Sequence, residues 1–162
     1  MSKIGRASRN ASLLRVESVA TAQSPKTIAD AESGELYLIN GADNVVINLP
    51  AVKEGAYFKF LITTAVGGGK SVTIQAAPNT VNIDGHLAQL TSNVTPTNAD
   101  ATAAGELANN VITRIDQGAA GDDKVIFGTG CTAGSFVECV CDGTKWIATG
   151  RATGGTLLFA AT

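Results

Sequence analysis

The chain has 162 residues and a formal net charge of −2, from 12 Lys or Arg and 14 Asp or Glu. This length fits one domain, and the charge balance argues against a general nucleic-acid binder, whose domain is usually strongly basic. Hydrophobic residues make up 44% of the chain and aromatic residues only 5%, so we expect a core of Val, Ile, Leu and Ala.

Residues 1–25 are predicted to form a flexible basic arm that ends at Pro25. Its charged side chains are four basic and one acidic: Lys3, Arg6, Arg9, Arg15 and Glu17. Its main apolar residues are Leu13, Leu14 and Val16. A helical turn at this apolar step would be too short to be stable alone in water. Two interpretations stay open, a disordered terminus and an arm that becomes ordered on a partner.

Residues 26–162 are predicted to form one all-β domain. Apolar and polar residues alternate in short segments, which is typical of strands with one buried face. The expected strands are 35–40, 45–49, 57–63, 71–76, 80–83, 111–115, 124–127, 135–141, 144–149 and 156–160. Short strands at this spacing indicate a β-sandwich or a jelly roll, and an open barrel-like fold also fits.

Two Asp-Gly pairs and one long polar segment lie between these strands. Asp142-Gly143 precedes a strand that carries Trp146, which predicts a β-hairpin. Asp84-Gly85 is also expected to be a turn, with His86 on the surface after it. Residues 88–110 are small and polar, so we expect a long loop, with one short helix around its second half (99–107).

The sequence shows no set of residues able to run a reaction, so we expect no enzyme, no cofactor and no metal site. The segment 67–71 (GGGKS) looks like a phosphate-binding loop, but the P-loop pattern requires Gly where Thr64 stands, and a strand follows instead of a helix. His86 is the only histidine, and nothing near it resembles a nucleophile elbow.

Cysteines and acidic pairs do not form a metal or catalytic pattern either. Cys131, Cys139 and Cys141 are spaced C-x7-C-x-C, unlike zinc pairs. Free thiols are expected, although a disulfide from Cys131 stays open. The acidic pairs are Glu32 with Glu35, and Asp122 with Asp123. A glycosidase would need two carboxylates across a cleft with stacking aromatics, so a solvated turn is expected at Asp122-Asp123.

The sequence also bears on compartment. Its start lacks the apolar run of a signal peptide, and no stretch approaches the roughly 18 apolar residues of a membrane span. An odd number of cysteines suits a reducing environment. We therefore expect a soluble protein made in a cytoplasm.

Three segments resemble small β-rich virion proteins of tailed bacteriophages. They are NVVINLPAVKEGAYFKFLIT (44–63), SVTIQAAPNTVNIDG (71–85) and GSFVECVCDGTKWIATG (134–150). The last resembles the closing hairpin of those chains, in which an Asp-Gly-Thr turn precedes a strand with Trp. Such segments recur in head decoration proteins, fibre proteins and uncharacterised virion proteins.

Within that group the resemblance implies a capsid decoration, or cement, protein. Such a protein is a homotrimer on the exterior of the phage head that holds capsomers together, and its arm lies along the major capsid protein. The arm residues expected to make this contact are Lys3, Arg6, Arg9, Leu13, Leu14 and Arg15. No nucleic acid, membrane or small-molecule substrate is expected as a partner.

Two other functions stay open. A fibre or host receptor-binding tip would contact its target through residues 88–110, although the chain has no long repetitive shaft. A small enzyme, such as a glycan hydrolase, would need an acid–base pair that the sequence does not offer.

Overall fold

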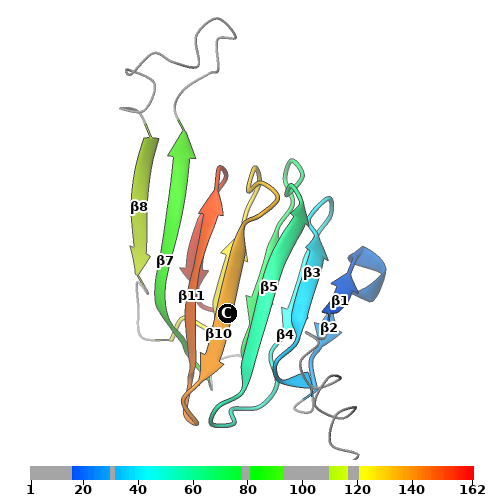
Figure 1. Cartoon of the computed structure of the whole chain (residues 1–162), viewed down its shortest axis with the longest axis vertical. Coiled ribbons are helices and arrows are strands. Elements are labelled where there is room, and N and C mark those ends of the chain that lie inside the picture. The colour runs from blue at the N-terminus through cyan, green and yellow to red at the C-terminus, as the bar shows by residue number, and fades with distance from the viewer. Residues whose placement is uncertain (1–15, 30–31, 78–80, 93–109, 117–120) are drawn as a thin grey trace, which may run out of the picture.

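The computed structural model describes residues 16–29, 32–77, 81–92, 110–116 and 121–162. In these ranges the chain forms twelve strands and one short 3₁₀ helix, η1 (Thr21–Gln23). The strands build two mixed sheets of one domain, and Figure 1 shows the larger sheet in front. The all-β prediction is therefore confirmed. No described helix has the length and apolar character that a membrane span requires.

The larger sheet contains seven of the described strands, in the order β1-β3-β5-β10-β11-β7-β8. Their bounds are β1 Val16–Val19, β3 Leu36–Asn40, β5 Tyr57–Thr64, β7 Ile83–Ser92, β8 Asn110–Asp116, β10 Phe136–Cys141 and β11 Trp146–Thr153. The smaller sheet contains the other five, in the order β12-β9-β6-β4-β2. Their bounds are β2 Lys26–Thr27, β4 Val45–Asn48, β6 Val72–Gln75, β9 Lys124–Phe127 and β12 Leu157–Ala160.

The first half of the body is a series of parallel crossover connections between the two sheets, which we call the coil. From β1 to β6 the described strands alternate between the sheets, so that each turn of the chain adds one strand to both. Neighbouring strands of the coil are parallel in both sheets, which requires crossover connections of this kind. The coil ends where β9 pairs with β6, and β10 with β5, in the antiparallel sense.

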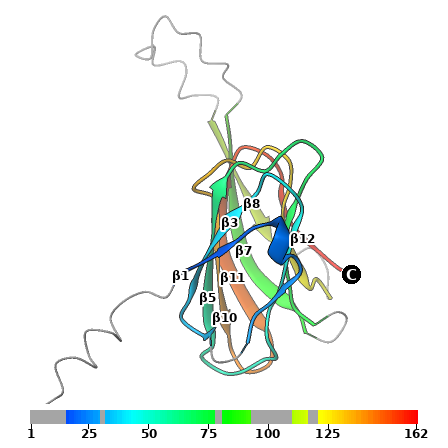
Figure 2. The same ribbon diagram turned by 90° about the vertical axis from the view of Figure 1, so that its right-hand side faces the viewer.

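The core lies between the two sheets, which face each other in the side view of Figure 2. Alternate residues of each strand point into it, as in β5, where Phe58, Phe60 and Ile62 are buried. The largest fully buried aromatic side chains are Trp146, Tyr37, Phe58, Phe60 and Phe127. Burying each of them contributes about 1.5–3 kcal/mol. The core contains the expected Val, Ile, Leu and Ala residues, and these five large aromatic side chains are buried with them.

Three ring contacts join the aromatic residues of the larger sheet, and the longest of them, between Tyr37 and Phe58, spans 6.4 Å. The ring centroids of Phe58 and Trp146 lie 5.7 Å apart, and those of Tyr37 and Phe60 lie 5.4 Å apart. Such pairs add to the free energy gained from area burial alone. Strands β3, β5 and β11 are thus held together by side chains as well as by backbone hydrogen bonds.

The predicted β-hairpin is confirmed. Strands β10 and β11 pair in the antiparallel sense, with Cys141 opposite Trp146. Asp142 closes the turn, because its Oδ1 accepts hydrogen bonds from the backbone N–H groups of Thr144 and Lys145 at 2.8 and 2.9 Å. Gly143 has a φ of +97°, in the left-handed region that favours glycine.

The three cysteines are buried free thiols. Cys139 and Cys141 lie on the inner face of β10, as their spacing predicts. Cys131 is also covered, and its Sγ donates to the carbonyl of Thr156 at 3.2 Å. Burial raises the pKa of the Cys139 thiol to about 12, which disfavours the nucleophilic thiolate.

The body begins earlier than the sequence predicts. The expected arm reaches residue 25, yet β1 already pairs in parallel with β3, with Val16 beside Leu36. Lys26 adds an ion pair to Glu17 at 2.9 Å. The strand was missed because four residues carry too little alternation, and its stability comes from the neighbouring strand.

Two further local predictions are wrong. Asp84-Gly85 is not a turn, because β7 continues through it to Ser92 and so includes the start of the expected 88–110 loop. The rest of that loop, 93–109, and its expected helix lie outside the described residues. Asp122-Asp123 is not solvated, because the two residues are 5% and 1% exposed and their carbonyls accept the N–H groups of Ile83 and Ala76.

Replacing Gly85 by Ala is expected to destabilise the domain. Gly85 has a φ of +134°, and a Cβ there would lie 1.9 Å from the carbonyl oxygen of Ala148 on β11. The clash and the backbone strain together should lower the free energy of unfolding by roughly 3 kcal/mol, measured by urea denaturation. In Gly68→Ala, where the added Cβ meets nothing within 4 Å, the change should stay within about 1 kcal/mol. Equal losses in both variants would contradict this account.

Candidate functional site

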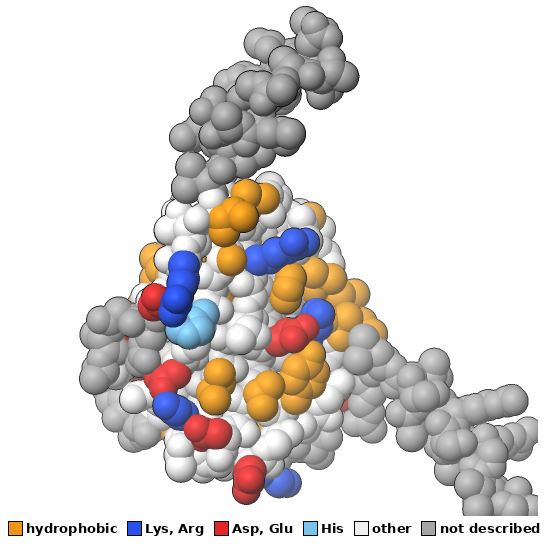
Figure 3. Space-filling model, turned by 60° about the vertical axis from the view of Figure 1, so that its left-hand side comes forward, with side chains coloured by type: hydrophobic (Ala, Val, Ile, Leu, Met, Phe, Trp, Pro, Cys, Tyr) orange, Lys and Arg blue, Asp and Glu red, His pale blue; other side chains and the backbone are white. Residues whose placement is uncertain are grey.

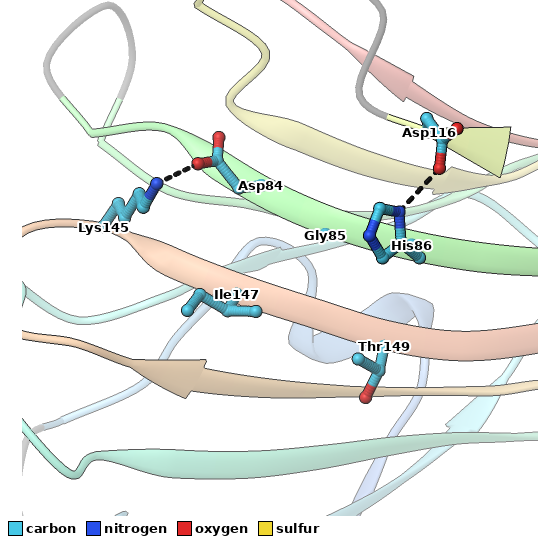
Figure 4. Close-up of a pocket in the computed structure, with 7 residues that line it drawn as sticks. All are labelled: Asp84, Gly85, His86, Asp116, Lys145, Ile147 and Thr149. Atoms are coloured by element: carbon cyan, nitrogen blue, oxygen red, sulfur yellow. Dashed lines mark hydrogen bonds and ion pairs between the residues drawn. The ribbon is translucent and has the colours of Figure 1, made fainter.

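One hollow among the described residues lies on the outer face of the larger sheet, over β7, β8 and β11. It is an open pocket of about 400 Å³. Its lining residues, drawn in Figure 4, are Asp84, Gly85, His86, Asp116, Lys145, Ile147 and Thr149. Figure 3 shows the same face, with the histidine in pale blue among acidic and basic side chains.

Strand register explains why these side chains meet. Strands β7 and β11 are parallel neighbours, which places Asp84 beside Ile147 and His86 beside Thr149. Alternate residues of a strand share one face, so all four side chains point outward. The residue between the two on β7 is Gly85, whose close approach to β11 admits no side chain. Antiparallel pairing of β7 with β8 brings Asp116 opposite His86.

Two groups of opposite charges flank the pocket. On one side Lys145 forms an ion pair with Asp84. On the other side the Oδ1 atom of Asp116 lies 2.6 Å from Nδ1 of His86 and 2.6 Å from Nε of Arg114. The carboxylate therefore holds the imidazole through Nδ1, and Nη2 of Arg114 lies 3.2 Å from Nδ1 and 3.5 Å from Nε2 of the same ring.

These pairs shift the pKa values of two of their members. The guanidinium of Arg114, and then the imidazole of His86, lowers the pKa of Asp116 below its ordinary 3.8 by hydrogen bonding. A hydrogen bond to Asp84 raises the pKa of Lys145 above its ordinary 10.5. Both groups are therefore charged throughout the neutral pH range, and each charge has an opposite charge beside it.

The pocket does not assemble a nucleophile with a base. Thr149 supplies the hydroxyl group among the lining residues, and no hydrogen bond in the described part of the chain joins it to His86. The segment 67–71, which resembles a phosphate-binding loop, connects β5 and β6 as a turn, and Lys70 pairs with Asp43 at 3.3 Å. What the pocket can do chemically is to accept and donate hydrogen bonds.

A cluster of acidic residues lies at the opposite edge of the larger sheet. Carboxylate oxygens of Glu17, Glu32 and Glu35 lie within 4.8 Å of one another. Lys26 neutralises part of this charge, with its Nζ 2.9 Å from Glu17 and 3.7 Å from Glu32. The buried Tyr37 hydroxyl donates to Glu32 at 3.1 Å. These contacts are those of a structural anchor that holds β1 and β2 to β3.

The outer face of the larger sheet also carries an apolar band. It crosses three strands, because Tyr57, Val140 and Ile147 are register neighbours on β5, β10 and β11. Val140 is 43% and Ile147 38% exposed. A second row, at a different level of the sheet, places Phe136 beside Leu61, and Leu61 beside Leu38. Hydrophobic side chains gather on this face in Figure 3.

The arm residues expected to bind a partner lie outside the described residues. They are Lys3, Arg6, Arg9, Leu13, Leu14 and Arg15. What the structure places is their attachment point: the arm joins the body at β1, the edge strand of the larger sheet. Sequence reasoning missed the pocket, since it took Asp84-Gly85 for a turn. The Asp84-x-His86 spacing, with both side chains on one face of a strand, was the available signal.

No family model, no curated protein and no solved structure matches this chain.

Replacing Arg114 by Gln is expected to raise the pKa of Asp116 toward 3.8, because Arg114 is the main cause of its lowering. The lowered pKa means that Asp116 favours the folded state above pH 3.8, and that this contribution disappears as the pH falls through the folded-state pKa. Carbon NMR titration of the Asp116 carboxyl measures the change. Arg151→Gln is the control, because Arg151 lies over the Phe136 ring instead. An unchanged pKa in Arg114→Gln would contradict the pairing.

Proposed function

We propose that this chain is a structural virion protein, a decoration or cement protein on the capsid exterior of a tailed bacteriophage. In this proposal it binds the major capsid protein as a homotrimer and stabilises contacts between capsomers. The observation that carries the proposal is the attachment of the basic arm to an edge strand, beside a sheet face with an exposed apolar band. The resemblance of the three sequence segments supplies the viral setting.

The edge position of β1 supports a strapping role for the arm. Val16 is 53% exposed and begins a strand whose ion pair from Glu17 to Lys26 fixes it to the body. Residues 1–15 are therefore attached to a firmly held strand. An extended segment can add to an exposed sheet edge of a partner through backbone hydrogen bonds, while arginines pair with acidic groups there.

The apolar band supports contact with a protein surface. Monomeric proteins rarely expose contiguous apolar patches with a polar rim unless these bind something. Here the ion pair of Lys59 with Glu138 at 2.6 Å, and Arg151, lie between and beside the apolar rows. Charged groups next to an apolar centre are typical of protein interfaces. We assign this face to contacts of the trimer with its neighbours or with the shell.

The contact of a single arm with the shell is weak, and a trimer would bind the shell more tightly. Three arms on one rigid body bind at high effective concentration once the first arm is engaged.

We further propose that the body is best classed as a β-sandwich. A jelly roll has antiparallel strands, whereas half of the strand pairs here are parallel. In this proposal the protein is not an enzyme and requires no cofactor.

A fibre or receptor-binding tip is the second candidate. The observation that favours it is the hairpin of β7 and β8, which pair over seven residues at the edge of the larger sheet. Residues 93–109 connect these two strands, so this segment starts and ends at that edge. A host-contacting loop would use such a place.

Deleting residues 1–15 is expected to abolish binding to shells stripped of this protein, while the body stays folded because β1 and β2 remain. Co-sedimentation with the shells measures binding, and circular dichroism with thermal unfolding checks the fold. The matched variant replaces Arg6, Arg9 and Arg15 by Gln in the full chain, and should weaken binding by about ten-fold or more, with a strong dependence on salt. Undiminished binding of the deletion variant would overturn the proposed role of the arm.

A further inference from the structure

The pocket over β7 and β11 is not explained by a cement function. Binding to a capsid shell requires only the edge strand with its arm and the apolar face. The pocket is a separate feature, a hollow of about 400 Å³ with polar groups on both sides. Pockets that hold small ligands start at about 300 Å³ and usually combine an apolar surface with a few convergent polar groups. The question is which ligand chemistry this set of groups fits.

The charges around the pocket favour an uncharged ligand over an ionic one. Lys145 and Arg114 each carry a positive charge, and Asp84 and Asp116 each carry a negative charge. These four charges sum to zero, and each of the two cations is already paired with a carboxylate. A phosphate or a carboxylate would have to compete with Asp84 or Asp116 for its partner. An uncharged ligand avoids that competition.

The groups that remain available are matched to hydroxyl groups. A carboxylate has about four lone-pair sites, so Asp84 and Asp116 keep acceptor capacity after their ion pairs. Lys145 has three N–H donors, of which its pair with Asp84 occupies one. Thr149 both donates and accepts. Both donors and acceptors therefore line the hollow, as a ligand with several neighbouring hydroxyl groups requires.

The floor of the pocket adds an apolar contact. Ile147 lies between the two charged sides, on the strand beside Asp84, and is 38% exposed (Figure 4). Gly85 adds no side chain to the hollow, so the strand backbone is approachable there. A flat ring with C–H groups on one face and hydroxyl groups at its rim fits this combination of floor and walls. Saccharides have that form.

We propose that this pocket is a binding site for one residue of a neutral saccharide, with Ile147 against the ring face and Asp84, His86, Lys145 and Thr149 bonded to its hydroxyl groups. The lining residues include no aromatic ring to stack on the sugar, and the polar groups are half exposed to water. The affinity for a single sugar should therefore be weak, with a dissociation constant of about 1 mM. Three copies in one trimer would raise it for a polymer.

The test is an NMR titration of the full chain, in solution and without shells, with D-glucose, D-galactose, D-mannose and N-acetyl-D-glucosamine in turn. At least one sugar should shift the signals of Ile147, Thr149 and the His86 ring, and leave those of the second apolar row, at Phe136 and Leu61, unchanged. Thr149→Val should weaken binding by about five-fold, the effect of one hydrogen bond. Thr153→Val is the matched control, because Thr153 is an exposed threonine of the same strand and face, outside the pocket.

Linear oligosaccharides of the bound sugar form the second arm of the test, and distinguish a free sugar from a polymer as the source. Inorganic phosphate is the third arm. The proposal is overturned if none of the four sugars shifts the pocket signals, if phosphate shifts them more strongly than any sugar, or if Thr149→Val and Thr153→Val bind equally. Because the test uses no shells, its failure would leave the proposed cement function untouched.

Discussion

The β10–β11 hairpin is the element on which the rest of the structure depends. On one side β10 pairs with β5, the last strand of the coiled half of the larger sheet, and on the other side β11 pairs with β7. The hairpin therefore joins the coil to the β7–β8 edge. Its turn is fixed by the hydrogen bonds of Asp142, and its Trp146 packs on Phe58 of the coil at 5.7 Å. Local turn chemistry and the central aromatic contact thus support the same strand order.

The surface features of the larger sheet follow from this arrangement. Inward side chains of the larger sheet are committed to the core, so the opposite face can carry groups that folding does not need. On that face the apolar band crosses β5, β10 and β11, and the pocket lies over β7, β8 and β11. The arm joins at the far edge through β1. One sheet thereby presents an exposed apolar band, an open pocket and the attachment point of residues 1–15.

Sequence reasoning located most of the strands, but of their pairings it predicted only the β10–β11 hairpin. Alternation at residues 57–63 and 135–141 predicted β5 and β10, because each strand has one buried face. The parallel coil could not be predicted, since pairing is decided by contacts far apart in the chain. Asp84-Gly85 reads as a turn locally, whereas the approach of Ala148 makes it part of a strand. The pocket could not be predicted either, because it depends on the pairing of β7 with β8, which brings together His86 and Asp116 from positions 30 residues apart.

The central claim, a protein that covers a shell as a structural component, is tested most directly by copy number. Quantitative mass spectrometry of purified source particles gives the ratio of this chain to the major shell protein. The account predicts a ratio near one to one, because a cement protein occupies sites across the whole shell. A handful of copies per particle would place the chain at a tail, vertex or fibre instead, and its absence from particles would contradict the account entirely.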